Sequence, residues 1–450
     1  MLKLFLWLKY VRRRRIILMS VAAVAMSVSL LIVVASLFTG FIAAFEQSAV
    51  NAIGDIIISA PDGLTFEQYP AFIERLEKTD IVEAATATLT SEGLLHLGGG
   101  NVRPVSIWGI QPDRRVRVMG FKKALLCQGR AAGDPSFRVA DAPDEIGGFV
   151  GIGVLGKPDE KTDQYDQDAI LKETLGKPVS VTTGKMEPTT DGGQEPKRRT
   201  ISFRITDVVF TGVYQLDSGQ VFLPIEVLQK KLYPTEGGFL ATSISIKLKP
   251  GVAPDSVVER IRELWGGFAA QELGWGPMAI SMTADRIKTA REMQKIYVAE
   301  FEKQKDVLEV IFSVISFGVV VLVFCIFYMM VKLKQKDIAI VISCGATSSS
   351  VIGLFVGFGV SVGVAGSGLG AALGYVITRH ISQIEGWIRV LFGLKLWRSS
   401  VYMFSEIPNQ IDWSSAAFYA AMAMMGAAVG ALVPALVAAR TRPVEVLRNE

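Results

Sequence analysis

The chain is poor in the residues that build covalent cross-links and metal sites. Its 450 residues include three cysteines (Cys127, Cys325 and Cys344) and two histidines (His96 and His380). No two cysteines form a Cys-x-x-Cys pair, which argues against a disulfide scaffold and against a thiolate metal site. Two isolated histidines leave little for zinc binding or histidine acid–base chemistry. We therefore expect neither a metal site nor a catalytic residue on this chain.

Charge is also absent from four long apolar runs, at residues 16–44, 310–331, 351–378 and 414–439. About 20 apolar residues cross a bilayer core, so each run predicts a transmembrane helix. The first run is longer than the apolar part of a signal peptide and therefore predicts a retained anchor. Ion-coupled transporters carry ionisable groups inside their spans, and their absence here argues against that class and against an intramembrane metalloprotease. The energy for any work would have to come from a partner.

Basic residues orient the four predicted spans. They cluster at residues 12–15, 332–336 and 440–448, which all fall on one side of a four-span chain. By the positive-inside rule, both termini are predicted to be cytoplasmic. Trp387, Trp397, Tyr402 and Trp413 lie in the predicted outer loop 379–413 and fit an interfacial belt. Residues 384–394 of the same loop are predicted to lie along the membrane surface.

Residues 46–300 are too polar for lipid and predict one large outer domain between the first and second spans. Alternating patterns predict strands at 55–59, 104–109, 202–209 and 243–248. Helices are predicted at 66–78 and 253–265. The fold class is therefore membrane α-helical, with four transmembrane helices and a large α+β domain of two lobes, the second at about 146–228. The chain divides into residues 1–45, 46–300 and 301–450.

Two further segments of this region carry expectations. Residues 182–199 lack apolar periodicity and predict an exposed loop or hairpin tip, either a binding element or plain flexible chain. Residues 284–317 contain no glycine or proline and predict one continuous helix that enters the second span. Such a rod suits mechanical coupling, and a simple anchoring stalk explains it equally well.

Several glycine motifs imitate functional sites. Gly151 to Lys157 nearly matches a phosphate-binding loop, but Pro158 replaces the hydroxyl residue that would hold magnesium. Gly359 to Gly363 fits a nucleophile elbow, but it lies inside a predicted span without a charged partner. We interpret the small residues that recur every four positions in the third and fourth spans as helix-packing surfaces.

Two segments resemble a known family of permeases. Residues 334–347, with Asp337-Ile338-Ala339-Ile340 and Gly345-Ala346-Thr347, are similar to the segment between spans two and three of MacB/FtsX/LolC-type ABC transporter permeases. The C-terminal residues 434–450 are similar to the closing segment of the same superfamily through Pro434, Ala438-Ala439-Arg440, Pro443, Glu445, Leu447-Arg448 and Glu450. The layout of one span, a large domain and three further spans also agrees.

Within that superfamily, the chain most resembles the LolC/LolE permeases of lipoprotein-releasing transporters. The resemblance includes residues 31–41 of the first span, Phe203 to Ser218, Glu302-Lys303 before the second span, and residues 402–413. It implies an inner-membrane permease for lipoprotein transport that works by mechanotransmission. Such a permease extracts lipoproteins from the outer leaflet and passes them to a periplasmic carrier. The large domain would be periplasmic.

The resemblance also implies partners and cofactors. Two permease subunits, either identical or sister chains, would pair with two copies of a cytoplasmic ABC ATPase. The chain itself would hold no cofactor and would not be an enzyme, since ATP and magnesium would bind the ATPase. Lipoprotein, membrane lipid and the carrier complete the expected partners, and no nucleic acid is expected.

Three groups of site residues follow from the resemblance. The ATPase-coupling residues, within the cytoplasmic segment 332–350, would be Lys334, Lys336, Asp337, Ile338, Ala339, Gly345, Ala346 and Thr347. The carrier-binding hook would lie in residues 182–199, with Pro188, Pro196, Lys197, Arg198 and Arg199. The lipoprotein cavity would be lined by Val34, Phe38, Phe41, Ile42, Leu308, Ile311 and Ile315. Ile342 stands where the family has a basic residue, and Leu436 and Val437 stand where it often has basic residues.

Two alternatives stay open at this stage. One is a MacB-like mechanotransmission permease for efflux or cell-envelope control. The other is a membrane scaffold or sensor without a transport role, whose outer domain binds a partner.

Overall fold

The structure is a computed structural model that describes residues 15–61, 64–159, 164–188, 194–234, 238–393, 397, 404 and 407–440. The chain forms two compact units. We call the first the helix bundle; it comprises Met1–Ala43, Tyr297–Trp387 and Ile407–Glu450. We call the second the outer domain; it comprises Ala44–Ile296 and Ile388–Glu406.

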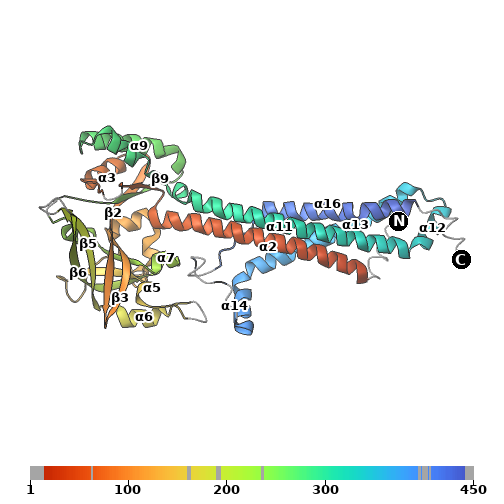
Figure 1. The fold of residues 1–450 in the computed structure, drawn as a ribbon, viewed down its shortest axis with the longest axis horizontal. Coiled ribbons are helices and arrows are strands. Elements are labelled where there is room, and N and C mark those ends of the chain that lie inside the picture. Colours follow the sequence, from red (N-terminus) through yellow and green to blue (C-terminus); the bar gives the residue numbers. More distant parts are fainter. Residues whose placement is uncertain are drawn as a thin grey trace. The chain divides into compact units, whose positions relative to one another are not determined.

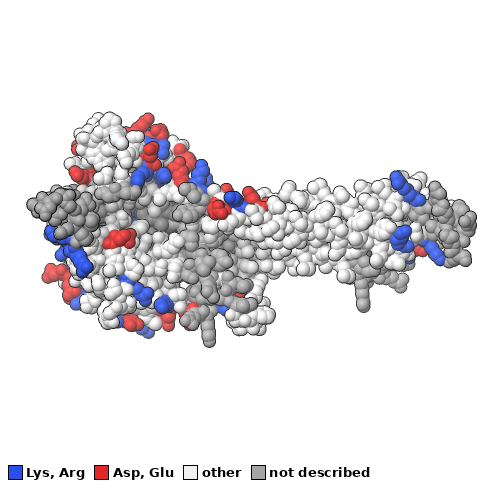
Figure 2. Space-filling view, in the orientation of Figure 1, with Lys and Arg blue, Asp and Glu red and all other residues white. Residues whose placement is uncertain are grey.

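Among the described residues, four helices are long and apolar enough to cross a membrane: α2 (Arg15–Ile53), α11 (Ala290–Leu333), α13 (Ser348–Arg379) and α16 (Trp413–Ala439). They confirm the four predicted spans. Two shorter helices accompany them, α12 (Gln335–Ser343) and α14 (Ile381–Phe392). Figure 2 shows the visible face of the bundle almost free of charged side chains along its middle. Such a surface is suited to lipid or to other apolar helices.

Glycines of α13 bring it into close contact with α16 and α2. Figure 1 labels the helices of the bundle. A Cβ atom built on Gly359 would lie 2.5 Å from Cβ of Ala431, and one on Gly363 would lie 2.9 Å from Cα of Met424, both on α16. Gly366, Gly370 and Gly374 make the same kind of contact with α2, at Val24, Val28 and Ile32. Small residues permit such approach in lipid, where apolar burial by itself gives no net drive. Two of the small-residue rows of the third span are therefore packing surfaces.

Helix α16 packs against α11 in the same way, because a Cβ on Gly430 would lie 3.0 Å from the backbone oxygen of Val320. Asp412 fixes where α16 begins, since its carboxylate accepts hydrogen bonds from the backbone N–H and hydroxyl groups of Ser414 and Ser415. These bonds, led by the two hydroxyls, lower the pKa of Asp412 to about 2. The start of the fourth span is thus set by an N-cap.

The long helix α11 begins later than the sequence pattern indicated. Residues 284–317 predicted one helix, but α10 (Pro277–Ala284) ends first, and β9 (Ile287–Thr289) pairs with β1 before α11 starts. Thr289 and Glu292 form a capping box: the Glu292 N–H donates to Thr289 Oγ1 and the Thr289 N–H donates to Glu292 Oε2, both at 3.0 Å. The prediction was wrong at this end because the Thr-x-x-Glu signal for a helix start was not used. From Ala290 the helix is continuous to Leu333.

The described part of the outer domain contains one mixed sheet of nine strands in the order β3-β7-β4-β6-β5-β2-β8-β1-β9. Their bounds are Ile56–Ser59 (β1), Val82–Gly98 (β2), Asn101–Ile110 (β3), Gly147–Gly151 (β4), Pro178–Pro188 (β5), Gln194–Val209 (β6), Gln220–Pro224 (β7), Ser243–Leu248 (β8) and Ile287–Thr289 (β9). The long strand β2 also pairs with β3, so that six strands form a closed circuit, and β8, β1 and β9 extend from it. This is the expected α+β class, and the division into two lobes stays a prediction.

Helices cover the sheet where apolar faces need burial. They are α3 (Tyr69–Glu77), α4 (Pro112–Val118), α5 (Ile152–Leu155), α6 (Gln167–Thr174), α7 (Tyr214–Asp217), α8 (Ile225–Leu232), α9 (Pro254–Gln271) and α10, with short 3-10 turns η1 (Gly120–Ala124) and η2 (Gln128–Arg130). Trp265 of α9 is fully buried, with ring contacts at 4.9 Å to Phe66 and 5.1 Å to Phe72. These aromatic contacts hold α3 and α9 together.

A buried carboxylate organises the turn between β6 and β7. Asp217 is 1% exposed and accepts hydrogen bonds from the backbone N–H of Thr211 at 2.7 Å, from the Thr211 hydroxyl at 2.8 Å, and from the Gly212 N–H at 3.0 Å. Desolvation outweighs these bonds and raises the pKa of Asp217 to about 6. The backbone of the same turn touches Gly151 and Gly153, whose Cβ atoms would lie 2.4 Å and 3.1 Å from the Asp217 carbonyl oxygen. The glycines of the phosphate-loop look-alike therefore serve packing.

The glycine contacts of the bundle lead to a matched pair of substitutions. We expect Gly359→Ala to lower the stability of the bundle by about 1–3 kcal/mol, because the new methyl group overlaps Ala431 and the backbone of α16. Gly357→Ala is the control, since nothing lies within 4 Å of its Cβ, and alanine favours a helix by up to about 1 kcal/mol. Thermal unfolding of both variants in neutral detergent measures the difference. Equal melting temperatures would contradict the packing role.

The pKa of Asp217 predicts a pH-dependent contribution to stability. A carboxyl whose pKa is raised on folding stabilises the fold fully below its usual pKa of 3.8, and this stabilisation is lost as the pH rises through about 6. Asp217→Asn does not titrate and leaves part of the three donors without an acceptor, so it is expected to be less stable throughout. The difference in melting temperature between wild type and variant should grow as the pH falls from 7 to 4. Parallel curves would show that Asp217 has an ordinary pKa.

Candidate functional site

The connection between α11 and α13 forms a compact helical turn. Lys334 separates α11 from α12, and its amine pairs with the carboxylate of Asp337 in the first turn of α12. Both side chains are partly exposed, at 26% and 50%, so this pair contributes little to stability by itself. Asp337 lies in the first turn of α12, where the helix dipole stabilises a negative charge.

The end of α12 is closed by a Schellman motif. The N–H of Ala346 donates to the carbonyl of Val341 at 3.3 Å, and the N–H of Gly345 donates to that of Ile342 at 3.0 Å. Gly345 has φ +95°, a conformation that side-chain-bearing residues rarely adopt. Thr347 then caps α13 by accepting a hydrogen bond from the N–H of Ser350 at 3.3 Å. The three residues Gly345, Ala346 and Thr347 thus make the reversal between two helices.

Helix α12 has one buried face and one exposed face. Ile338 (7% exposed) and Ala339 (0%) pack into the helix bundle. Ile340 (52%) and Val341 (50%) are exposed, next to the exposed Lys336 and Asp337. An apolar pair beside charged side chains, on an anchored and capped helix, is the composition of a protein-binding surface. The eight predicted coupling residues lie in the connection between α11 and α13: Lys334 precedes α12, Lys336 to Ala339 belong to it, and Gly345 to Thr347 follow it.

The residues predicted to line a lipoprotein cavity do not gather around a described cavity. Val34, Phe38, Phe41, Ile42 and Leu308 are partly buried, while Ile311 (48%) and Ile315 (47%) are exposed on α11. The Phe41 ring meets Phe301 edge-on at 4.8 Å. Their role in holding lipoprotein stays a prediction.

A cavity of about 260 Å³ lies elsewhere in the bundle, between α2, α11 and α16. Its lining includes Ser27, Ser316 and Tyr419, and the Ser27 and Ser316 hydroxyls lie 2.9 Å apart. The Tyr419 hydroxyl donates to Glu309 Oε1 at 2.8 Å and so links α16 to α11. Sequence reasoning missed this link, although Glu309 directly precedes the predicted second span and a carboxylate there needs a partner.

The predicted hook is a β-hairpin for most of its length. Strands β5 and β6 stay paired from Pro178 with Arg204 to Pro188 with Gln194, so the ladder runs through most of residues 182–199. Lys197 and Arg198 are exposed, and the side chains of Pro188 and Pro196 lie outside the described residues, as do residues 189–193. The neighbouring strand β4 pairs with β6 only from Arg204 onward, which leaves Pro196 on an edge, where proline is tolerated. The pattern lacked alternation because residues 182–199 contain few apolar residues.

The comparisons with known proteins agree with these features. The family model of the MacB-like periplasmic core domain matches residues 17–264, and that of the FtsX-like permease C-terminal region matches residues 309–443. The lipoprotein-releasing system transmembrane protein LolC of Neisseria meningitidis is 24% identical over 100% of this chain and 99% of its own length. LolC of Xylella fastidiosa is 24% identical over 98% of both chains.

A solved structure is also similar to part of the chain. The periplasmic region of MacB from Actinobacillus actinomycetemcomitans covers 55% of this chain and 95% of its own, with 15% identity and a TM-score of 0.31. The first family model alone spans more than half of the chain, and the second covers the last three spans. The chain therefore belongs to the MacB/FtsX superfamily of ABC transporter permeases, as a permease of the LolC/LolE type.

Proposed function

We propose that the chain is the permease subunit of an ABC transporter that extracts lipoproteins from the outer leaflet of the inner membrane and passes them to a periplasmic carrier. The observation that carries this proposal is the similarity to LolC, which extends over 100% of this chain and 99% of that relative. Similarity over both chains in full covers the bundle, the outer domain and the α12 turn together. If the two proteins shared only a membrane anchor or a single domain, the similarity would cover only part of each chain.

The energy in this proposal comes from a separate cytoplasmic ATPase, present in two copies with two permease subunits. The exposed face of α12 supports this assignment because it presents the apolar pair Ile340 and Val341 beside the charged side chains of Lys336 and Asp337. The basic residues near α12 favour the cytoplasmic side for it. ATP and magnesium would then be held by the ATPase.

Rigid elements would transmit the motion of the ATPase. α12 is fixed to the bundle through Ile338 and Ala339, and only Lys334 separates it from α11. α11 continues without a break for 44 residues, from the capping box at Thr289 to Leu333. A continuous helix transmits displacement along its axis, since its hydrogen bonds resist extension. Carrier recruitment by Lys197, Arg198 and Arg199 of the hairpin is part of the same proposal.

A second candidate shares the mechanism and differs in cargo. The match to the MacB-like periplasmic core domain also fits a mechanotransmission permease for efflux or envelope control. The fate of lipoproteins after loss of this chain separates the two.

The coupling proposal predicts the effect of a charge on α12. Ile340→Asp places a carboxylate at the centre of the exposed apolar face and is expected to weaken ATPase binding at least about tenfold, since apolar anchors dominate such interfaces. Ile340→Leu keeps the apolar surface and is the matched control. The loss of binding is measured by the amount of ATPase that co-purifies with each variant and by the increase in ATP hydrolysis that each variant causes. The melting temperature of each variant checks that it is folded. Full retention of the ATPase by Ile340→Asp would place the docking surface elsewhere.

The transport proposal predicts where lipoproteins accumulate. Depletion of the chain is expected to leave outer-membrane lipoproteins in the inner membrane, because their acyl chains do not leave a bilayer without energy input. Membrane fractionation after depletion measures this, and re-expression of the wild-type chain should restore sorting. Normal sorting together with sensitivity to toxic compounds would favour the efflux candidate instead.

A further inference from the structure

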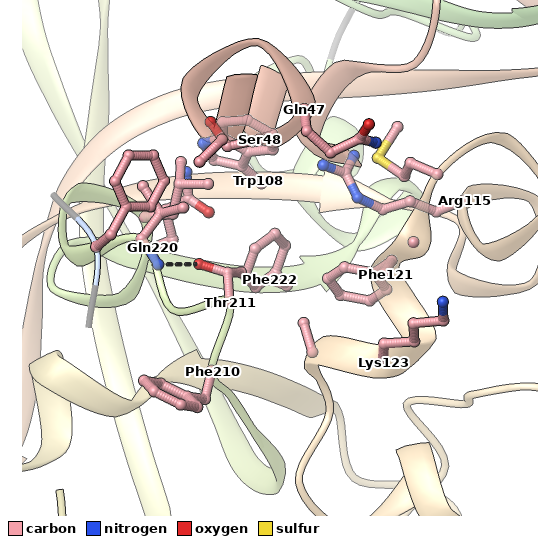
Figure 3. Close-up of a pocket in the computed structure, with 17 residues that line it drawn as sticks. Gln47, Ser48, Trp108, Arg115, Phe121, Lys123, Phe210, Thr211, Gln220 and Phe222 are labelled. Atoms are coloured by element: carbon pink, nitrogen blue, oxygen red, sulfur yellow. Dashed lines mark hydrogen bonds between the residues drawn. The ribbon is translucent and has the colours of Figure 1, made fainter. Parts of the chain in front are cut away.

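A pocket of about 410 Å³ lies in the outer domain, and all of its lining residues belong to that unit (Figure 3). Its walls come from the end of α2, from β3, from the segment that contains α4 and η1, and from the turn held by Asp217. Phe404 closes one side, where its backbone pairs with Val213. The volume falls within the range of small-molecule sites, roughly 300–1,000 Å³. Neither the proposed coupling surface nor the hairpin includes any of these residues.

A buried cation forms part of the wall. Arg115 is 3% exposed, and its guanidinium carbon lies 5.0 Å from the ring centre of Trp108, 5.4 Å from that of Phe121 and 5.8 Å from that of Phe222. Its Nη1 donates to the Thr88 hydroxyl at 3.2 Å. Loss of hydration lowers the pKa of Arg115 to about 9, so that it remains charged at neutral pH. The aromatic faces offset part of the cost of desolvating this charge.

The remaining polar groups of the lining favour an anion. Lys123 also lines the pocket, and in Figure 3 its side chain points from the lower loop toward the Arg115 side. Gln47 and Gln220 add amide groups, and the Arg115 guanidinium reaches toward Gln47 in the same view. Among the described lining residues there is no Asp or Glu. Two cations without a lining carboxylate give the interior a positive potential.

The rest of the wall is apolar and strongly aromatic, with Trp108, Phe121, Phe210, Phe222 and Phe404. A small inorganic anion would satisfy the cations but leave these rings facing water. A neutral apolar molecule would fill the space but offer no negative charge to the two cations of the lining. The lining therefore suits a molecule that has both an anionic group and an apolar part. If a methylene group fills about as much space as a water molecule, roughly 30 Å³, the pocket holds a chain of about ten carbons with its head group.

We propose that this pocket binds an anionic amphiphile, with a carboxylate or phosphate head group held by Arg115 and Lys123 and a chain of about ten carbons against the aromatic walls. A guanidinium stacked among rings also occurs as a structural group. The adjacent open volume and the second cation distinguish this site from a filled core. The inference does not depend on the lipoprotein proposal.

The test uses the full chain in maltoside micelles and a photoactivatable decanoic acid as the probe. Cross-linked peptides are identified by mass spectrometry, which separates binding in the pocket from partition into the micelle. We expect saturable labelling of peptides that contain Trp108, Phe121 or Phe222. Unlabelled decanoate and decyl phosphate should both compete, and their relative strength shows whether a fatty acid or a phosphate-bearing lipid is the better ligand. Decanol, with the same chain and no charge, should compete at least about tenfold less well.

Two substitutions test the role of charge. Lys123→Glu reverses an exposed charge at the pocket and is expected to weaken decanoate competition about tenfold or more. Lys172→Glu makes the same change on α6, outside the pocket lining, and should leave competition unaltered. Arg115→Gln should abolish labelling, provided that its melting temperature shows a folded protein. If Arg115→Gln does not fold, the result for Lys123→Glu alone decides whether the pocket binds anions. Absent labelling of these peptides, equal competition by decanol, or equal behaviour of the two lysine variants would overturn the proposal.

Discussion

The bundle depends on the close approach of helices that have no apolar driving force to bring them together. In lipid, a leucine gains nothing by moving from an acyl chain to a neighbouring helix, so contact must come from shape. Gly359 and Gly363 provide this shape toward α16, and Gly366, Gly370 and Gly374 provide it toward α2. Because α13 thereby contacts α16 and α2 at once, the close approach of these three helices depends on two rows of missing side chains.

Helix α12 is joined to this bundle. Ile338 and Ala339 are buried, and Gly345 lets the chain reverse directly into α13. Under the proposed coupling role, a force applied to the exposed pair Ile340 and Val341 would act on helices that are already packed together. In the outer domain, Asp217 has a comparable role, since one buried carboxylate holds the turn that shapes both a glycine contact and a pocket wall.

Local patterns in the sequence predicted much of the fold. Runs without charge predicted the four spans, because burial in a membrane excludes charge along a whole helix. The strand patterns at residues 55–59 and 243–248 predicted β1 and β8 to within a residue. These patterns did not predict the start of α11, where the signal is a pair of polar capping residues. Thr289 and Glu292 mark the true start of α11, and β9 before them is too short to show alternation. The hairpin at residues 182–199 shows no alternation because it contains few apolar residues.

The sequence by itself determined the membrane topology class, the family and the short element that carries Lys334 to Thr347, since each depends on residues adjacent along the chain. The tertiary structure decided which glycine rows pack against which helix. It also brought Arg115 and Lys123 together with aromatic rings from distant segments around one open volume. That assembly joins residues from Ala44 to Phe404, and no periodicity or spacing encodes it, because pairing between distant strands places those side chains.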